Sequence, residues 1–536
     1  MKTILCSFIF LSISVCLTAQ PGTLDSSFNK DGKVISKTYT GECFTSLIQP
    51  DGKIVVGGSG SYYKGNNLLG GSLLARYNID GSLDYSFADS GRGVYILGDT
   101  SAYIPVIHAM VLQKDGKILA LGAFAQLNGE FGFALMRFST DGSADKSFGI
   151  NGMTLSNFTG LDFPKDLAVL SNGKIVVTGY AYNAPNENEK CFLSCYNIDG
   201  SLDKNFGDSG VTIIDLGFNL RINAIAVTTG NKIIIGGIDD TYFKNILLRY
   251  DDNGIIDSSF GINGLAKMYF AKNIADGTIN DITINTDGTI ITAGWIELNS
   301  GTIAISVSRF AQNGKPDSSF GTNGYTYIQK SIGNSYGTSV AIQRNGKIII
   351  GGYHSVSDTV SFMVVRYNAE GSLDSAFGVN GIQNTFILGS DLAYSVNLQR
   401  DGKIVMAGYS LIYYGSNYRY SVELVRYNGD STKRQIIINK IKHYISTHNN
   451  ADATTLNNSI NLYPNPANNI VTINNLDAKT NYGLSIINNK GNVVATKQVS
   501  NLSFYQFNLQ NVSSGVYYVN VVANNKLITT LKFVKQ

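Results

Sequence analysis

The chain has 536 residues, of which 43% are hydrophobic and 15% charged, a composition typical of a folded globular protein and not of a disordered one. Its formal net charge is only +3 and it has no long basic run, so nucleic-acid binding has no electrostatic support. The 57 glycines against 8 prolines favour many tight turns between strands.

Residues 1–19 predict a cleaved export signal. Lys2 gives a positive start, and the apolar stretch over 4–17 is too short for a comfortable membrane span. Ala19 is a small residue at a suitable cleavage point. A lipid anchor on Cys16 is the alternative, although Val15 stands where a lipoprotein signal needs a small residue. No later stretch reaches transmembrane length, so we expect no membrane span in the mature chain.

Three cysteines, Cys43, Cys191 and Cys195, follow the export signal. Cys191 and Cys195 stand four apart in a strand-like run, which places them roughly 13 Å apart, too far for a disulfide. We therefore expect buried free thiols and no disulfide framework.

Two phrases alternate along residues 20–430. One joins two apolar runs through a turn, as in SLIQPDGKIVVGG at 46–58 and VAIQRNGKIIIGG at 340–352, and it occurs seven times. Asp-Gly or Asn-Gly between β-branched runs predicts a hairpin, because the turn needs positive φ. The other phrase is YNIDGSLDYSF at 77–87. Its last residue recurs as Phe28, Phe87, Phe148, Phe206, Phe260, Phe320 and Phe377. Four antiparallel strands in each of seven repeats predict an all-β fold, a seven-bladed β-propeller.

The repeat is out of phase with the chain ends. Residues 24–39 hold only a fourth strand, and the last repeat, at 394–428, lacks one. We therefore expect the N-terminal strand to complete the seventh blade and close the ring, which hides both sheet edges.

Residues 20–430 resemble the delta-60-repeat family of bacterial β-propellers. The resemblance rests on the RYNxDGSLDxSFGxxG phrase at 76–91 and 366–381 and on QxDGKIVVGG at 49–58. It implies the propeller fold and brings no common activity with it.

The spacing of acidic residues in the repeated phrase is similar to that of calcium-binding hairpins. Arg76 occupies the position of the first ligand, which is a poor choice for binding a cation. We interpret the phrase as scaffold: Asp80 and Gly81 make the turn, Asp84 accepts backbone N–H groups, and Phe87 fills the space between blades. We expect no metal and no cofactor.

Function is expected in the longer loops on the face opposite the Asp-Gly turns, where aromatic side chains gather. The candidates for ligand contact are Tyr62, Tyr63, Tyr103, Tyr182, Tyr242, Trp295, Tyr336, Tyr353, Tyr413 and Tyr414. The same connections hold Tyr180, Phe243, Tyr394 and Tyr409. No nucleophile elbow, phosphate loop or metal-spaced histidine pair is present, so no catalytic residue is assigned.

Residues 431–459 predict a polar linker with a short helix, on Ile437, Ile441 and Ile445 at helical spacing. Residues 460–536 alternate apolar and polar residues and predict a small β-sandwich. This segment resembles the type A C-terminal sorting domain of the Bacteroidota type IX secretion system. The matching motifs are LYPNP at 462–466, NKG at 489–491, SGVYY at 514–518 and KFVK at 532–535. The resemblance implies contact with that machinery and its sortase, then release or attachment at the cell surface.

The sequence thus favours an exported or surface-bound propeller scaffold that binds a glycan or a protein. The alternatives are an extracellular glycan-active hydrolase or lyase with carboxylates at the propeller mouth, and a structural surface protein.

Overall fold

The structure is a computed structural model. It describes residues 19–36, 40–64, 67–88, 92–95, 105–125, 131–158, 162–181, 190–239, 241, 244–328, 332–414, 417–430, 460–465, 467–488, 492–523 and 526–536. Within these ranges all regular elements are strands, so no helix there could cross a membrane. The chain divides into two units, Met1–Ile438 and Asn439–Gln536. The predicted export signal, apart from Ala19, and the predicted linker at 431–459 lie outside the described residues.

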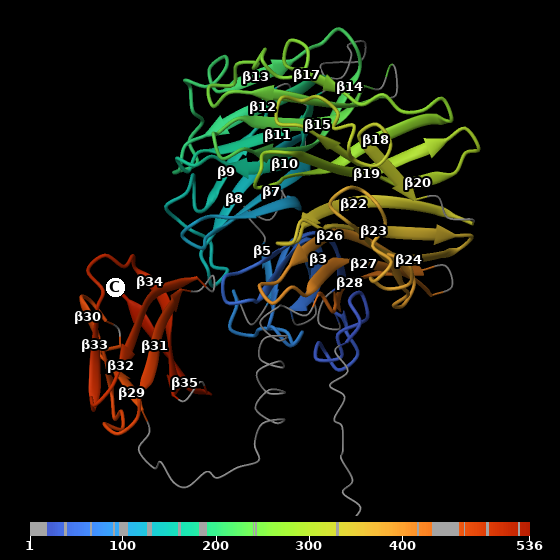
Figure 1. The fold of residues 1–536 in the computed structure, drawn as a ribbon. Coiled ribbons are helices and arrows are strands. Elements are labelled where there is room, and N and C mark those ends of the chain that lie inside the picture. The colour runs from blue at the N-terminus through green and yellow to red at the C-terminus, as the bar shows by residue number, and fades with distance from the viewer. Residues whose placement is uncertain are drawn as a thin grey trace, which may run out of the picture. The chain divides into compact units, whose positions relative to one another are not determined.

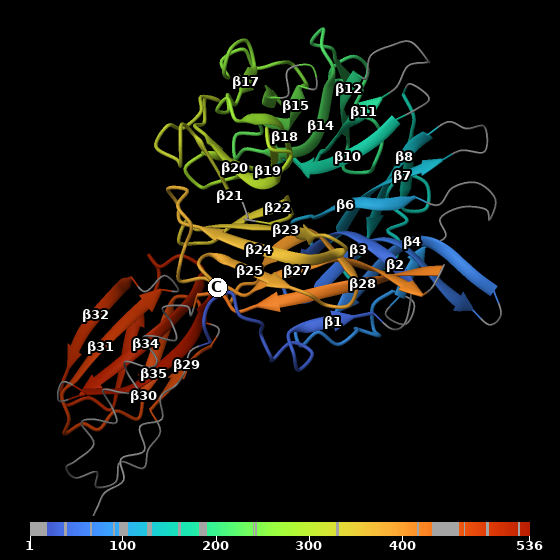
Figure 2. The same cartoon turned by 90° about the vertical axis from the view of Figure 1, so that its right-hand side faces the viewer.

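The strands of the first unit, as far as the structure describes them, fall into seven groups of four (Figures 1 and 2). The first three groups are β2 (Thr40–Ile48), β3 (Ile54–Lys64), β4 (Asn67–Tyr77), β5 (Arg92–Tyr95); β6 (Val106–Leu112), β7 (Ile118–Ala125), β8 (Phe131–Phe138), β9 (Met153–Ser156); and β10 (Asp162–Val169), β11 (Ile175–Ala181), β12 (Lys190–Tyr196), β13 (Val211–Ile214). The next three are β14 (Leu220–Val227), β15 (Ile233–Asp239), β16 (Lys244–Tyr250), β17 (Leu265–Lys267); β18 (Ile274–Ile284), β19 (Ile290–Leu298), β20 (Ile303–Phe310), β21 (Tyr325–Ile328); and β22 (Asn334–Ile342), β23 (Ile348–Val356), β24 (Thr359–Tyr367), β25 (Ile382–Thr385). The last is β26 (Ser390–Leu398), β27 (Ile404–Tyr414), β28 (Asn417–Tyr427) and β1 (Lys33–Ile35). Each group is antiparallel, and one parallel bridge, Val360 to Ser390, joins the last two groups into an eight-stranded sheet.

The predicted hairpins form at the Asp-Gly and Asn-Gly turns. In the first group, Gly52 N–H donates to the Gln49 carbonyl (2.9 Å), and Gln49 N–H donates to the Lys53 carbonyl (2.9 Å). Asp51 Oδ1 accepts the Lys53 N–H (3.1 Å). Gly52 has a φ of 91°, which glycine adopts without a steric penalty. The turn residues therefore set the register of the strands that follow.

The N-terminal strand pairs with the last group, as its place in the repeat predicts. Val34 of β1 lies opposite Leu424 of β28, and Leu24 forms a further bridge to Tyr427. The first strands of neighbouring groups contact one another in sequence, and β26 contacts β2 of the first group. The beginning and end of the repeat region therefore share one sheet.

The core lies between the groups and uses the repeated phenylalanine. Phe87 is fully buried between side chains of the first and second groups, including Leu74 and Ile107. A Cβ built on Gly142, in the turn of the second group, would lie 2.5 Å from the Phe87 ring. The turn glycine is thus needed for close packing as well as for its φ of 85°.

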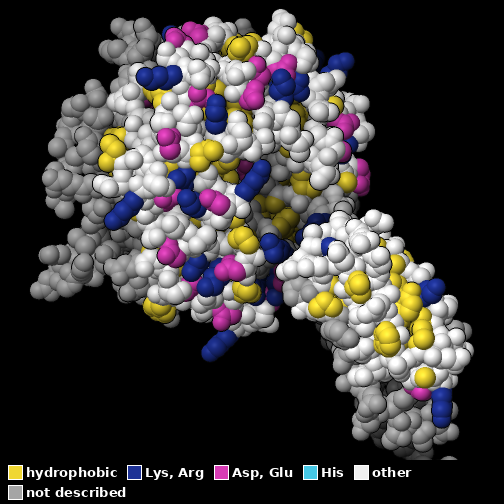
Figure 3. Space-filling view, turned by 90° about the vertical axis from the view of Figure 1, so that its left-hand side faces the viewer, with side chains coloured by type: hydrophobic (Ala, Val, Ile, Leu, Met, Phe, Trp, Pro, Cys, Tyr) yellow, Lys and Arg dark blue, Asp and Glu magenta, His cyan; other side chains and the backbone are white. Residues whose placement is uncertain are grey.

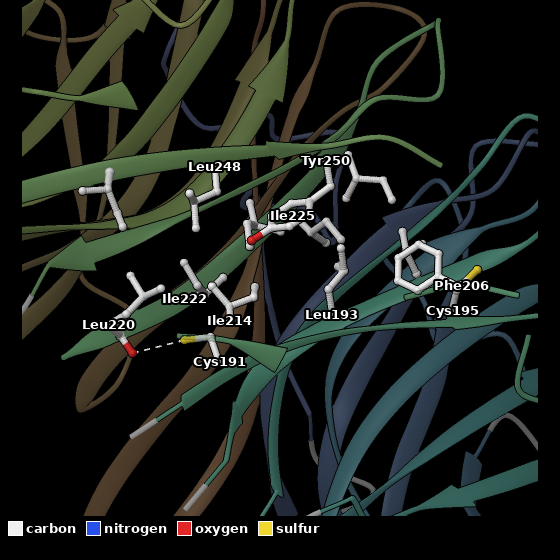
Figure 4. Close-up of a cluster of buried hydrophobic side chains, with 14 of the residues drawn as sticks. Cys191, Leu193, Cys195, Phe206, Ile214, Leu220, Ile222, Ile225, Leu248 and Tyr250 are labelled. Atoms are coloured by element: carbon white, nitrogen blue, oxygen red, sulfur yellow. Dashed lines mark hydrogen bonds between the residues drawn. The ribbon is translucent and has the colours of Figure 1, made fainter. Parts of the chain in front are cut away.

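The three cysteines are buried and free, which confirms the interpretation from their spacing. Figure 4 shows Cys191 in the cluster between the third and fourth groups, where its thiol donates to the Leu220 carbonyl (3.1 Å). Burial raises the pKa of Cys195 to about 12, so this thiol stays protonated and unreactive at neutral pH.

The second unit contains two sheets. One has the order β29 (Asn461–Tyr463), β30 (Ile470–Asn474), β33 (Phe504–Asn508); the other has β32 (Val493–Val499), β31 (Tyr482–Asn488), β34 (Gly515–Ala523), β35 (Lys526–Lys535). Buried side chains of both sheets form one cluster, with Val471 and Ile473 from one and Leu484 and Val519 from the other. Asn465 holds the last strand: its amide donates to the Lys532 carbonyl (3.1 Å) and accepts the Val534 N–H (3.0 Å).

Candidate functional site

The acidic residue of the repeated phrase is engaged in scaffolding. Asp84 Oδ2 lies 2.7 Å from both Arg76 Nε and Lys53 Nζ, while Oδ1 accepts the Ser86 N–H (3.0 Å). Burial by itself would raise the pKa of Asp84, but the hydrogen bonds from Lys53 and Ser86 outweigh it and lower the pKa. Among the described residues, no group of three or more His, Cys, Asp or Glu could hold a metal ion.

The arginine of the phrase links six of the seven groups to the next one. Arg76 lies over the Phe87 ring, 4.5 Å from its centroid, and donates to the Thr140 carbonyl of the second group (2.8 Å). Arg137, Arg249 and Arg309 donate in the same way to Ile198, Gln312 and Ala369, Arg366 pairs with Asp430, and Arg426 of the last group donates to Ile79 of the first. Cys195 takes the arginine position in the third group. The phrase therefore connects neighbouring groups and belongs to the scaffold.

A cavity of about 760 Å³ is lined by first and second strands, with residues from all seven groups. We call it the inner cavity. Figure 3 shows one face of the chain's surface, where lysine and arginine are interspersed with aspartate and glutamate. The inner cavity thus differs from that surface, because most of its lining side chains are aromatic or uncharged polar.

Seven β-bulges aim side chains into the inner cavity. In β2 the register shifts between Cys43 and Thr45, which leaves Phe44 as an extra residue. The first strands of all the groups bulge at the corresponding place. The extra residues are Phe44, His108, Lys165, Asn223, Asn280, Thr338 and Tyr394, and all seven line the cavity. A bulge turns one side chain out of the alternation, so this repeated irregularity builds the lining.

In the third and fifth groups, the residue after the bulge is an aspartate that bonds to the next group. Asp166 Oδ2 accepts the Ile225 N–H (3.0 Å), and Asp281 Oδ2 accepts the Val340 N–H (2.8 Å). Burial raises the pKa of Asp166 to about 7 and that of Asp281 to about 6, and the charge of Asp281 adds to the shift of Asp166. Both carboxyl groups line the inner cavity.

Three of the predicted aromatic residues come together in the inner cavity. Trp295, Tyr336 and Tyr353 all line it. Tyr336 stacks on Tyr353, with ring centroids 4.9 Å apart, and Trp295 meets Tyr336 edge-on at 6.3 Å. The expectation that they lie in loops is wrong: they lie in β19, β22 and β23. The second strands continue past the Ala-Gly or Gly-Gly pair to Trp295 and Tyr353, and β22 begins before Tyr336, because the backbone ladder needs no particular side chain.

Of the other predicted residues, only Tyr413 has a described side chain, and it is not part of the cavity lining. Tyr103, Tyr182 and Tyr242 lie outside the described residues. Tyr62 and Tyr63 fall in β3 and Tyr414 in β27, but their side chains are not described. Tyr413, also in β27, is 66% exposed.

Several lining residues escaped the sequence interpretation, among them Phe44, His108, Phe163 and Lys165. Desolvation by the surrounding protein and the nearby Lys165 charge lower the pKa of His108 to about 4, so its imidazole is neutral at pH 7. The residue still has solvent-accessible surface, because it faces the inner cavity. For the second-strand residues of the lining, the position within the repeat is a signal that the sequence does carry. The residue after the glycine of the second strand is Ser59, Ala123, Tyr180, Ile238, Trp295, Tyr353 or Tyr409, and aligning the repeats would have separated the aromatic groups from the others.

Two family models match the chain. The one described as "Domain of unknown function (DUF5122) beta-propeller" matches residues 49–87, 113–148, 170–206, 286–320, 343–377 and 399–433. The one described as "Secretion system C-terminal sorting domain" matches residues 461–536. The fourth strand group is outside the matched segments but has the same four-stranded order as the others.

Solved structures show only distant likeness. A subtype N11 neuraminidase-like protein from a flat-faced bat virus (H18N11) is 11% identical over 72% of this chain and 98% of its own, with a TM-score of 0.37. Trypanosoma rangeli sialidase is 10% identical over 93% and 83%, with a TM-score of 0.30. The exo-β-1,3-galactanase 1,3Gal43A of Clostridium thermocellum is 11% identical over 62% and 79%, also at 0.30. These scores carry no functional argument, and no curated protein matches the chain in sequence.

Proposed function

We propose that this chain, which joins DUF5122 β-propeller repeats to a type IX secretion system C-terminal sorting domain, is an exported binding scaffold whose ligand site is the inner cavity. The sorting domain supports export to the cell surface or the medium, through contact with the secretion machinery.

The scaffold we propose is a closed ring of seven blades over residues 20–430, followed by a linker and a β-sandwich over 460–536. Closure is supported by the β1–β28 pairing and by the contact of β26 with β2. It is also supported by Ser46, whose hydroxyl lies 2.9 Å from that of Ser395, 349 residues along the chain. A ring of this kind holds the cavity lining rigid, so little conformational entropy is lost when a ligand binds.

One observation carries the proposal: the bulges at the corresponding place of all seven groups deliver seven side chains into a single cavity. A bulge interrupts the backbone ladder, so seven at the same place make sense as a device for presenting side chains. The lining also combines stacked aromatic rings with amides and hydroxyls, a combination suited to recognising a ligand with both apolar faces and polar groups.

The test compares binding of the intact mature protein with that of cavity variants on an array of glycans and extracellular proteins. We expect Trp295→Ala with Tyr353→Ala to abolish every specific signal. Tyr85→Ala is the matched control, because Tyr85 is 65% exposed in a turn of the repeated phrase and outside the cavity lining. Retention of the signals in the cavity variant, with an unchanged melting temperature in both variants, refutes the proposed site.

A hydrolase or lyase is the second candidate, and one observation favours it. Asp166 and Asp281 share the cavity with pKa values raised to about 7 and about 6, in the range suited to proton transfer at neutral pH. Against this, each carboxylate already accepts a backbone N–H on both oxygens, Asp166 from Leu167 and Ile225, and Asp281 from Ile282 and Val340. Product formation from any bound glycan, lost in Asp166→Asn and Asp281→Asn, would favour the enzyme over the scaffold.

A further inference from the structure

A continuous row of aromatic rings leads out of the inner cavity along the last strand group. His108 and Phe44 meet at 5.3 Å between centroids, and Phe44 meets both Tyr394 (5.4 Å) and Tyr409 (5.7 Å). Tyr409 then meets Tyr420 edge-on at 5.6 Å. The row ends where Tyr420 meets Tyr418 at 5.5 Å. We call these six rings the aromatic track.

The outer end of the aromatic track lies on an unusually long hairpin. β27 and β28 have 11 residues each, as do β3 and β4, whereas the second and third strands of the other groups have 7 to 9. Figure 2 shows the β27–β28 hairpin beside the first group. Tyr413 lies directly opposite Tyr418 in the register, so both point to the same side of the hairpin as Tyr420. Tyr413 is 66% and Tyr418 is 61% exposed, so these rings face solvent.

A hydrogen-bond acceptor lies beside the aromatic track. Burial, and then the charge of Glu42, raise the pKa of Tyr420, and the same charge acts on Tyr394 and Tyr409. Ser59 donates to Glu42 Oε2 (2.9 Å), and Oε1 has no partner among the described residues. The exposed rings at the outer end of the track are therefore followed by a carboxylate oxygen, whereas Tyr409, only 8% exposed, supports its neighbours Tyr394 and Tyr420.

We propose that the aromatic track binds a linear neutral carbohydrate chain that extends from the inner cavity along the β27–β28 hairpin. This inference rests on the proposed binding function and names its ligand class. The C–H bonds on the face of a sugar ring carry slight positive charge and stack on the negative face of an aromatic ring. Sugar hydroxyls at the ring edge can donate to Glu42 Oε1. An anionic chain is disfavoured here, because Glu42 would repel it.

The test measures binding of the full mature protein to neutral hexasaccharides and to the disaccharides of the same linkage. The probes are β-1,4-glucan, β-1,3-glucan, β-1,4-xylan, β-1,4-mannan and α-1,4-glucan oligomers, and a polyproline peptide serves as the competing ligand class. We expect at least one hexasaccharide to bind tenfold or more tightly than its disaccharide. Tyr413→Ala with Tyr418→Ala should remove that tenfold gain, whereas Tyr85→Ala should keep it.

Equal affinity for the hexasaccharide and the disaccharide overturns the proposal that the aromatic track binds carbohydrate. So does retention of the gain in the double variant, binding of the polyproline peptide alone, or failure of every sugar to bind. The cavity variant Trp295→Ala with Tyr353→Ala separates the two proposals. If it abolishes binding on the array while Tyr413→Ala with Tyr418→Ala changes nothing, the inner cavity is the site and the track is not part of it. If neither variant changes binding, both proposals fail.

Discussion

Asp25 and Arg426 stand 401 residues apart in sequence, yet Arg426 Nε lies 2.7 Å from Asp25 Oδ2. Both side chains are buried, with 7% and 2% of their surface exposed. Lys403 Nζ lies 2.8 Å from the same oxygen. The pair is the counterpart of Asp84 with Arg76, but here its two halves come from opposite ends of the repeat region.

Breaking this pair is therefore expected to destabilise the repeat region. Asp25→Ala leaves the Arg426 charge buried without its partner and should lower the free energy of unfolding by about 3 kcal/mol or more. Urea denaturation of the mature chain measures the change. The control is Asp358→Ala, because Asp358 is exposed in the turn between β23 and β24. Equal stability of the two variants would contradict the role given to Asp25.

Placing an arginine at the position of Cys195 in the third group should raise the free energy of unfolding. Around Cys195 the backbone keeps the pattern of the other groups, since Asp203 N–H donates to the Cys195 carbonyl (2.8 Å) as Asp84 does to Arg76. Cys195→Arg would place a guanidinium beside Asp203 and over Phe206. We expect a gain of about 1 kcal/mol or more from the new charged hydrogen bonds. Cys195→Met, similar in added bulk but uncharged, is the control in the same urea experiment, and an arginine variant less stable than it would refute the expectation.

Stability should fall at high pH because of Glu423. This side chain is fully buried, and neither of its carboxyl oxygens has a hydrogen-bond partner in the described part of the chain. Burial, and then the nearby Asp391, raise its pKa from 4.5 to about 9. The folded chain thus holds a proton that the unfolded chain releases above pH 4.5. The contribution of Glu423 to the free energy of unfolding is therefore fully present below pH 4.5. It is lost as pH rises towards 9, by up to about 1.4 kcal/mol per pH unit.

Glu423→Gln should remove this part of the pH dependence, because the amide stays neutral. The measurement is the free energy of unfolding at pH 5, 7 and 9 for the wild type, Glu423→Gln and the half-buried control Glu297→Gln. Only the Glu423 variant should show a flatter profile. Parallel profiles for all three proteins would mean that Glu423 is ionised in the folded chain.

Removing the sorting domain should separate export from binding. A chain ending at Asp430 keeps β1 to β28 and the Arg366–Asp430 contact (2.8 Å). We expect it to fold, to bind the array ligands of the full chain, and to remain in the periplasm of a host with the matching secretion system. Fractionation of cells and medium decides the outcome. Arrival of the truncated chain outside the cell at the full-length level would show that residues 460–536 are not the export signal.

The repeated parts of the fold could be predicted from sequence because each hairpin turn has a recognisable sequence motif. Asp51-Gly52 and its counterparts require positive φ, and seven copies make the strand order unambiguous. The second-strand aromatics could be named, but their position in the lining could not. The bulge residues Phe44 and His108 escaped because a one-residue shift in pairing leaves no trace in a single strand, and only the partner strand reveals it.

The pairing of β1 with β28 in one sheet also affects the order in which the sheet can form during synthesis. β1 belongs to the first part of the repeat region to leave the ribosome, and its partner in β28 is not synthesised until about residue 425. Through most of synthesis β1 therefore has no partner to pair with, and the last joining step brings the oldest segment to the youngest. A chain cut short before Asn417 could form most of its sheets but never seat Lys33–Ile35. Pairing of this one short strand therefore requires the chain to have been made through residue 425.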